Sequence, residues 1–145
     1  MQVGHIGINV NNIQRSKEFY MKLFGFDLMG ESSEEGKQFA FLGNEGKLLV
    51  TLWEQSDKPF SCSSAGLHHL AFELEDMDRL RSFENTLEAL GVDKIYDKMV
   101  SHKEGASSGG LFFLDPDGTR LEVCVSAGMH ECSPASVDGP SCGFF

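Results

Sequence analysis

The chain has 145 residues, the size of one ordinary domain with room for a real hydrophobic core. Its formal net charge of −10 and a pI near 4.8 argue against binding to nucleic acid or to an anionic membrane surface, because both need clustered Lys and Arg. No stretch approaches the ~20 apolar residues that span a bilayer, and the start lacks a signal-peptide pattern. The four cysteines have no CxxC spacing, so we expect a cytoplasmic protein with reduced thiols.

The first part of the chain has the pattern of a strand, a helix and three further strands. Residues 3–10 alternate as in a strand, and a helix is expected from Asn11 or Asn12 as N-cap to Gly25 as C-cap. The apolar residues at helical spacing are Ile13, Phe19, Tyr20, Leu23 and Phe24. Three short strands follow, separated by turn residues, at 26–30, 37–43 and 46–54.

After a polar connection, the same βαβββ order begins again. The expected strands are 67–74, a weaker one near 93–100, 109–115 and 119–126. The expected helix runs from Asp76 to Gly91, and its apolar side consists of Met77, Leu80, Phe83, Leu87 and Leu90. The sequence therefore predicts an α+β domain over residues 1–126, built from two βαβββ modules at 1–54 and 66–126, with an irregular extension at 127–145.

The two modules match in sequence when HIGINVNN is laid on HLAFELED, which pairs His5 with His69. At the module ends, GKLLVTL matches GTRLEVC, which aligns Glu122 with Val50, or with Thr51 if the pairing slips by one. This internal repeat, more than any single motif, determines the predicted architecture.

Strand alternation predicts which side chains face away from the helices. On those faces the first, fifth and last strands carry His5, Gly7 and Asn9; His69, Ala71 and Glu73; and Arg120, Glu122, Cys124 and Ser126. Small residues beside both histidines leave room for a ligand. His68 falls on the opposite, helix-facing side and is expected to be structural.

Two histidines and one carboxylate from these faces predict a metal site formed by His5, His69 and Glu122. This ligand set is typical of non-heme Fe(II), and Mn(II), Zn(II), Ni(II) or Co(II) can occupy similar sites. The alternative is that both histidines are ordinary hydrogen-bonded residues and that Glu122 pairs with Arg120.

The motifs HIGINVNNIQRSKEFY, HHLAFELED and FFLDPDGTRLEV resemble those of the vicinal oxygen chelate superfamily, which includes glyoxalases, type I extradiol dioxygenases, fosfomycin resistance enzymes and bleomycin-binding proteins. The resemblance implies a cupped, half-open barrel around a divalent metal, with His5, His69 and Glu122 as ligands, and a small-molecule substrate that chelates through vicinal oxygens. Short members with two modules are usually homodimers. The resemblance therefore leaves open whether His5 joins the other ligands within one chain or across two.

Departures from the family patterns bear on the reaction. Val50 or Thr51 stands where glyoxalase I enzymes have an acidic ligand, and Gly7 stands where fosfomycin-modifying enzymes have threonine. Bleomycin-binding members lack the ligand triad. VSHKEGASSGGLFFLDPDGTRLE resembles the extradiol dioxygenase signature, with Phe112 in place of a tyrosine.

We therefore expect a dioxygenase-like, metal-dependent oxidoreductase with Fe(II) favoured. The alternatives are a glyoxalase-like isomerase or lyase, a thiol transferase, and a non-catalytic drug-binding resistance protein.

Further residues are candidates for catalysis or substrate binding. His102 is a candidate acid or base, with an exposed loop histidine as the alternative, and Glu73 is a candidate general base or an exposed rim residue. The candidate substrate-binding residues are Asn9, Arg120, Cys124 and Phe112. Trp53 is expected in the core.

The tail after residue 126 loses periodicity and is rich in Gly, Ser, Pro and Cys. Two terminal phenylalanines favour burial, so we expect the tail to fold over the domain or a partner chain, with His130, Cys132 or Cys142 able to approach the metal. A mobile tail is the alternative.

Overall fold

The computed structural model describes residues 1–136 and 139–143 and divides into two compact units. Unit 1 comprises Met1–Ser61 with Pro116–Gly118, and unit 2 comprises Cys62–Asp115 with Thr119–Phe145. Each unit is built on one of the predicted modules. Within the described residues, none of the helices has the length and apolar character needed to cross a membrane.

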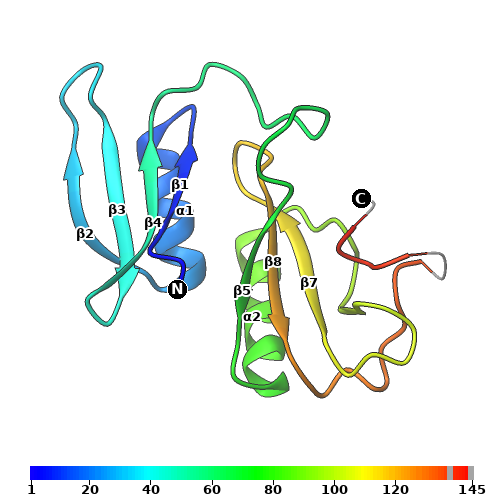
Figure 1. Ribbon diagram of the computed structural model, residues 1–145. Coiled ribbons are helices and arrows are strands. Elements are labelled where there is room, and N and C mark those ends of the chain that lie inside the picture. Colours follow the sequence, from blue (N-terminus) through cyan, green and yellow to red (C-terminus); the bar gives the residue numbers. More distant parts are fainter. Residues whose placement is uncertain (137–138, 144–145) are drawn as a thin grey trace. The chain divides into compact units, whose positions relative to one another are not determined.

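Unit 1 follows the predicted βαβββ order (Figure 1). Its elements are β1 (Ile6–Asn9), α1 (Ile13–Phe24), β2 (Asp27–Ser32), β3 (Phe39–Asn44) and β4 (Lys47–Trp53). The sheet has the order β1-β4-β3-β2, in which β1 runs parallel to β4 and the other neighbours are antiparallel. Helix α1 packs on β3 and β4.

The ends of α1 are determined by local sequence. The side chain of Asn12 accepts a hydrogen bond from the backbone N–H of Arg15 at 2.8 Å, so Asn12 rather than Asn11 is the N-cap. Gly25 ends the helix in the left-handed region, with φ 68°, where glycine carries no steric cost. Tyr20 and Leu23 are buried, as the helical spacing predicts.

Unit 2 repeats the order with a second mixed sheet. Its elements are β5 (Leu70–Glu73), α2 (Met77–Leu90), β6 (Val100–Ser101), β7 (Gly109–Leu114) and β8 (Arg120–Val125). The sheet has the order β5-β8-β7-β6, with β5 parallel to β8 and α2 packed on β7 and β8. The two βαβββ modules of the predicted α+β fold are thus confirmed.

Three details of unit 2 differ from the expectation. The strand expected from residue 67 begins only at Leu70. The strand near 93–100 is reduced to β6, because before it only Lys94 forms an isolated bridge, to Phe113 of β7. Leu90 is 45% exposed, whereas Leu80 and Leu87 are fully buried, so the apolar side of α2 ends one turn earlier than predicted.

Strand pairing shows which residue of the first module corresponds to Glu122. Gly7 pairs with Thr51 across β1 and β4, and Ala71 pairs with Glu122 across β5 and β8. Gly7 and Ala71 each lie two residues after the matched histidines, so Thr51 is the counterpart of Glu122. The alignment with Val50 is wrong by one residue, and the slipped alternative is correct.

The turn that precedes β8 is held firmly within unit 1. Asp117 is buried, and its carboxylate accepts hydrogen bonds from the backbone N–H of Asn11 at 3.1 Å and from the hydroxyl of Ser16 at 3.4 Å. It also forms an ion pair with Arg15. The carbonyl of Asp117 accepts a hydrogen bond from Phe60 N–H at 2.9 Å. Backbone and side chain of this one residue therefore both fix the turn.

The described part of the tail lies against unit 2 and forms no helix or strand. Met129 is fully buried, and its N–H donates to the carbonyl of Ser107 at 2.9 Å. The carbonyl of Ser133 accepts a hydrogen bond from Ser101 N–H at 3.2 Å. The tail thus folds back as one of the two alternatives predicts, while its terminal phenylalanines lie outside the described residues.

Candidate metal centre

A buried carboxylate lies at the centre of the candidate site. Glu122 stands in the middle of β8, between its pairing partners Ala71 in β5 and Phe112 in β7. Its side chain is only 3% exposed. A buried charge is costly unless it is paired, so the groups around this carboxylate determine what the site can do.

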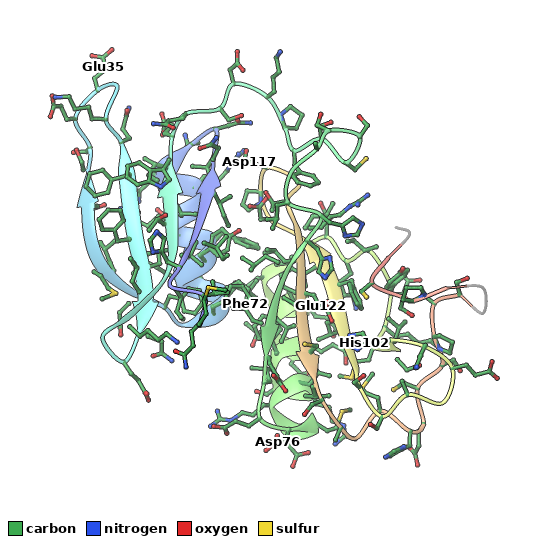
Figure 2. All side chains as sticks on the ribbon, viewed as in Figure 1. Glu35, Phe72, Asp76, His102, Asp117 and Glu122 are labelled. Carbon is green, nitrogen blue, oxygen red and sulfur yellow. The ribbon has the colours of Figure 1, made fainter. Side chains whose placement is uncertain are left out.

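Each oxygen of Glu122 meets a different histidine. Oε2 lies 3.2 Å from Nε2 of His69, and Oε1 lies 2.7 Å from Nε2 of His102. Figure 2 shows His102 and Glu122 next to each other. The carboxylate is therefore held between two imidazoles, one preceding β5 and one following β6.

His69 is 24% exposed and lies one residue before β5 begins. Burial lowers its pKa below the ordinary histidine value, and the negative charge of Glu122 only partly opposes this effect. The neutral imidazole is thereby favoured, which is the form that binds a metal ion.

His102 is half-buried rather than fully exposed, with 27% of its side chain accessible. Its Nδ1 lies 3.0 Å from the hydroxyl of Ser108, while Nε2 bonds to Glu122. A neutral His102 that carries its proton on Nε2 donates to the carboxylate and accepts from Ser108. The loop histidine is thus oriented at both nitrogens.

The predicted position of His68 is wrong. The structure exposes its side chain, with Nδ1 2.8 Å from Nδ1 of His69 and Nε2 3.1 Å from the carbonyl oxygen of Gly143. Strand alternation does not apply here, because β5 begins only at Leu70. Sequence reasoning therefore missed a residue that contacts the predicted ligand directly.

The remaining candidates divide between the two units. His5 and Asn9 lie in unit 1, exposed, just before and at the end of β1. In unit 2, Glu73 is exposed on β5 and Arg120 is half-buried at the start of β8. Unit 2 by itself thus brings together His69, Glu122 and His102.

Phe112 and Cys124 flank Glu122 in different ways. Phe112 is 1% exposed, and its ring lies edge-on to His102 at 6.5 Å between centroids, so it supports that histidine instead of offering a surface to substrate. Cys124 is half-buried, and burial together with the charge of Glu122 raises the pKa of its thiol to about 12. A neutral thiol therefore lies beside the carboxylate.

The two central donors fit a divalent ion. Two ligand atoms that share one ion at about 2.1 Å each and at a right angle lie about 3 Å apart. The separation of 3.2 Å between His69 Nε2 and Glu122 Oε2 matches this value, and the pair needs a proton or a cation between its atoms. Among the described residues, no group of three or more His, Cys, Asp or Glu converges as a metal site. Unit 2 thus holds two of the three predicted ligands.

Comparison with known proteins identifies relatives of this chain. The chain is 29% identical over 121 residues to metallothiol transferase FosB of Staphylococcus haemolyticus, which covers 83% of this chain and 81% of FosB. It is 27% identical over 127 residues to catechol-2,3-dioxygenase of Bacillus subtilis, over 83% of this chain and 40% of that protein.

Among solved structures, a glyoxylase/bleomycin resistance protein/dioxygenase domain from Frankia sp. matches with a TM-score of 0.72 at 20% identity, covering 86% of this chain and 97% of that one. This likeness concerns the fold. The model of the Glyoxalase/Bleomycin resistance protein/Dioxygenase superfamily matches residues 2–123. The chain belongs to this superfamily.

Proposed function

We propose that the protein is a metal-dependent enzyme, and that His5, His69 and Glu122 hold a divalent ion. The observation that carries the proposal is the 3.2 Å separation between His69 Nε2 and the buried Oε2 of Glu122. Strand alternation in the sequence predicts both residues as ligands, and the internal repeat pairs His69 with His5. Fe(II) is the favoured ion, because two imidazoles and one carboxylate are typical of non-heme iron sites.

The favoured reaction is a dioxygenase-like oxidation of a small molecule that presents two neighbouring oxygens. A bound divalent ion supplies Lewis acidity, substrate orientation and, if it is iron, a position for O₂. His102 Nε2 lies 2.7 Å from Glu122 Oε1, and His102 is the candidate acid or base. Similarity to the B. subtilis catechol-2,3-dioxygenase supports this class of reaction.

Other side chains have proposed roles around the substrate. Asn9 and Arg120 are candidate substrate contacts, and exposed Glu73 is a second candidate base. Cys124 contributes a neutral thiol next to the carboxylate. We further propose that the protein acts as a homodimer in the cytoplasm, with His5 of one copy completing the site of the other.

Thiol transfer is the second candidate function. Its support is the match to FosB, which extends over most of both chains. A glyoxalase-like reaction has less support, because Thr51 takes the place of an acidic fourth ligand. A non-catalytic drug-binding protein would not need His5, His69 and Glu122 to bind a metal. Metal analysis of the wild type and of ligand variants therefore separates this role from the enzymatic proposals.

The decisive experiment is metal analysis of protein purified without a chelating tag. We expect wild type to retain a divalent metal and the variants His69→Ala and Glu122→Gln to lose it, because each removes a donor of the 3.2 Å pair. The matched control is Glu131→Gln, at an exposed position in the tail. Absence of metal from wild type, or unchanged affinity in His69→Ala, contradicts the proposal.

A further inference from the structure

The ring of His68 links the predicted ligand His69 to the tail. Its Nδ1 lies 2.8 Å from Nδ1 of His69, and its Nε2 lies 3.1 Å from the carbonyl oxygen of Gly143. Both contacts lie within unit 2. The chemistry of these two partner atoms indicates where the protons of the ring lie.

The arrangement follows from hydrogen-bond chemistry. The carbonyl of Gly143 can only accept, so Nε2 of His68 carries a proton. A neutral His68 then has a bare Nδ1, which accepts the proton on Nδ1 of His69. Neutral His69 is thereby left with its lone pair on Nε2, the atom that faces Glu122.

This is the tautomer that a metal ligand needs. A histidine that binds a metal through one nitrogen almost always donates the N–H of the other to a fixed acceptor, and loss of that acceptor costs metal affinity. In this chain the acceptor is a second imidazole. Because the carbonyl of Gly143 binds Nε2 of this imidazole, Nδ1 is left as its acceptor atom.

The tail is anchored strongly enough to play this part. Ser141 is 1% exposed; its N–H donates to the carbonyl of His102 at 2.8 Å, and its hydroxyl donates to the carbonyl of Ser101 at 2.6 Å. The phenol of Tyr96 donates to the carbonyl of Ser141 at 2.8 Å. Gly143 follows two residues later, in a turn closed by its N–H on the carbonyl of Pro140 at 3.0 Å.

We propose that His68 and the tail segment Ser141–Gly143 form a positioning element that orients His69 for metal binding. The segment bonds to the backbone carbonyl of His102, whose ring contacts Glu122, and to the ring of His68, which contacts His69. The inference rests on the proposed function, because it takes His69 as a ligand. His68 and the segment Ser141–Gly143, which are not among the proposed ligands, thereby gain a role in the site.

The test measures the dissociation constant for Co(II) by competition with a chelator, together with the visible spectrum of the Co(II)-loaded protein. We expect His68→Ala and deletion of residues 141–145 to weaken Co(II) binding by about 10- to 100-fold and to change the spectrum. His68→Asn keeps an acceptor oxygen near the position of Nδ1, so it should recover most of the affinity. Glu131→Gln is the control, because Glu131 is an exposed residue of the same tail.

The outcomes separate this inference from the function on which it rests. Normal Co(II) binding by His68→Ala, or binding by His68→Asn as weak as that of His68→Ala, overturns the positioning role even if His69→Ala and Glu122→Gln lose the metal. Failure of wild type to bind Co(II) overturns both. Thermal melting of each metal-free variant identifies any loss of fold. If the deletion unfolds the protein, the His68 variants still test the proposal, because His68 is exposed and its substitution leaves the core intact.

Discussion

The thiol of Cys124, two residues after Glu122, has a strongly raised pKa. Burial first, and then the charges of Glu122 and Glu73, raise the pKa of Cys124 to about 12. The thiol consequently stays protonated throughout the neutral range, where a nucleophile would need to be ionised. Cys124 is thus suited to contacting substrate as a neutral group.

Alkylation should distinguish the cysteines of the metal-free protein. At pH 8, a thiol with this pKa is ionised to the extent of only about 10⁻⁴, so Cys124 should react with iodoacetamide far more slowly than exposed Cys62. Peptide mapping by mass spectrometry after short exposures measures both rates, and labelling in denaturant provides the control. Equal rates in the folded protein would show that Cys124 is not shielded.

At the scale of elements, the turn at Asp117 connects sequence to stability. One carboxylate satisfies a backbone donor at the start of α1, a buried hydroxyl and the guanidinium of Arg15. Removing it leaves the part-buried Asn11 N–H and the buried Ser16 hydroxyl without this acceptor. Such losses are among the larger effects of single substitutions.

We expect Asp117→Ala to lower the free energy of unfolding by about 2–4 kcal/mol, since it removes one buried acceptor that serves several donors. Asp57→Ala, at an exposed position, should change it by about 0.5 kcal/mol or less. Urea unfolding followed by circular dichroism measures both. Similar stability of the two variants would mean that the turn is not held by this carboxylate.

What could be predicted from sequence depended on periodic signals. The caps at Asn12 and Gly25 were predictable because their residue types suit those backbone positions. Alternation along the six-residue β8 predicts that Glu122 shares a face with Cys124, and the structure brings Glu122 to His69. The four-residue β5 is too short for alternation to reach His68. The contact with Gly143 uses a backbone carbonyl, which every residue has, so no side-chain pattern could reveal it.

At the scale of the whole molecule, the proposed ligands come from both units: His5 from unit 1, and His69 and Glu122 from unit 2. In a homodimer with shared sites, each ion binds one histidine from one copy and two ligands from the other. A closed two-fold dimer of this kind has two equivalent sites. Mixing two inactive variants then distinguishes shared sites from sites within one chain.

We expect His5→Ala and His69→Ala, each deficient in metal binding alone, to recover binding when unfolded and refolded together in equal amounts. Random pairing gives one intact site in each mixed dimer, so about a quarter of all sites should bind metal. Co(II) titration of the mixture measures this fraction, and each variant refolded alone is the control. No recovery would indicate that His5 serves its own chain.

The equivalence of Thr51 and Glu122 bears on how such a chain could arise by duplication. The same strand position carries a carboxylate in one copy and, in the other, a hydroxyl that accepts a hydrogen bond from Trp53 Nε1 at 3.1 Å. Around Trp53 lie Phe39 and Phe41, with a cavity of about 300 Å³ beside Phe39. After a duplication, this strand position can carry a carboxylate in one copy and a hydroxyl bonded to Trp53 in the other. Neither side chain changes the strand pairing that the two copies share.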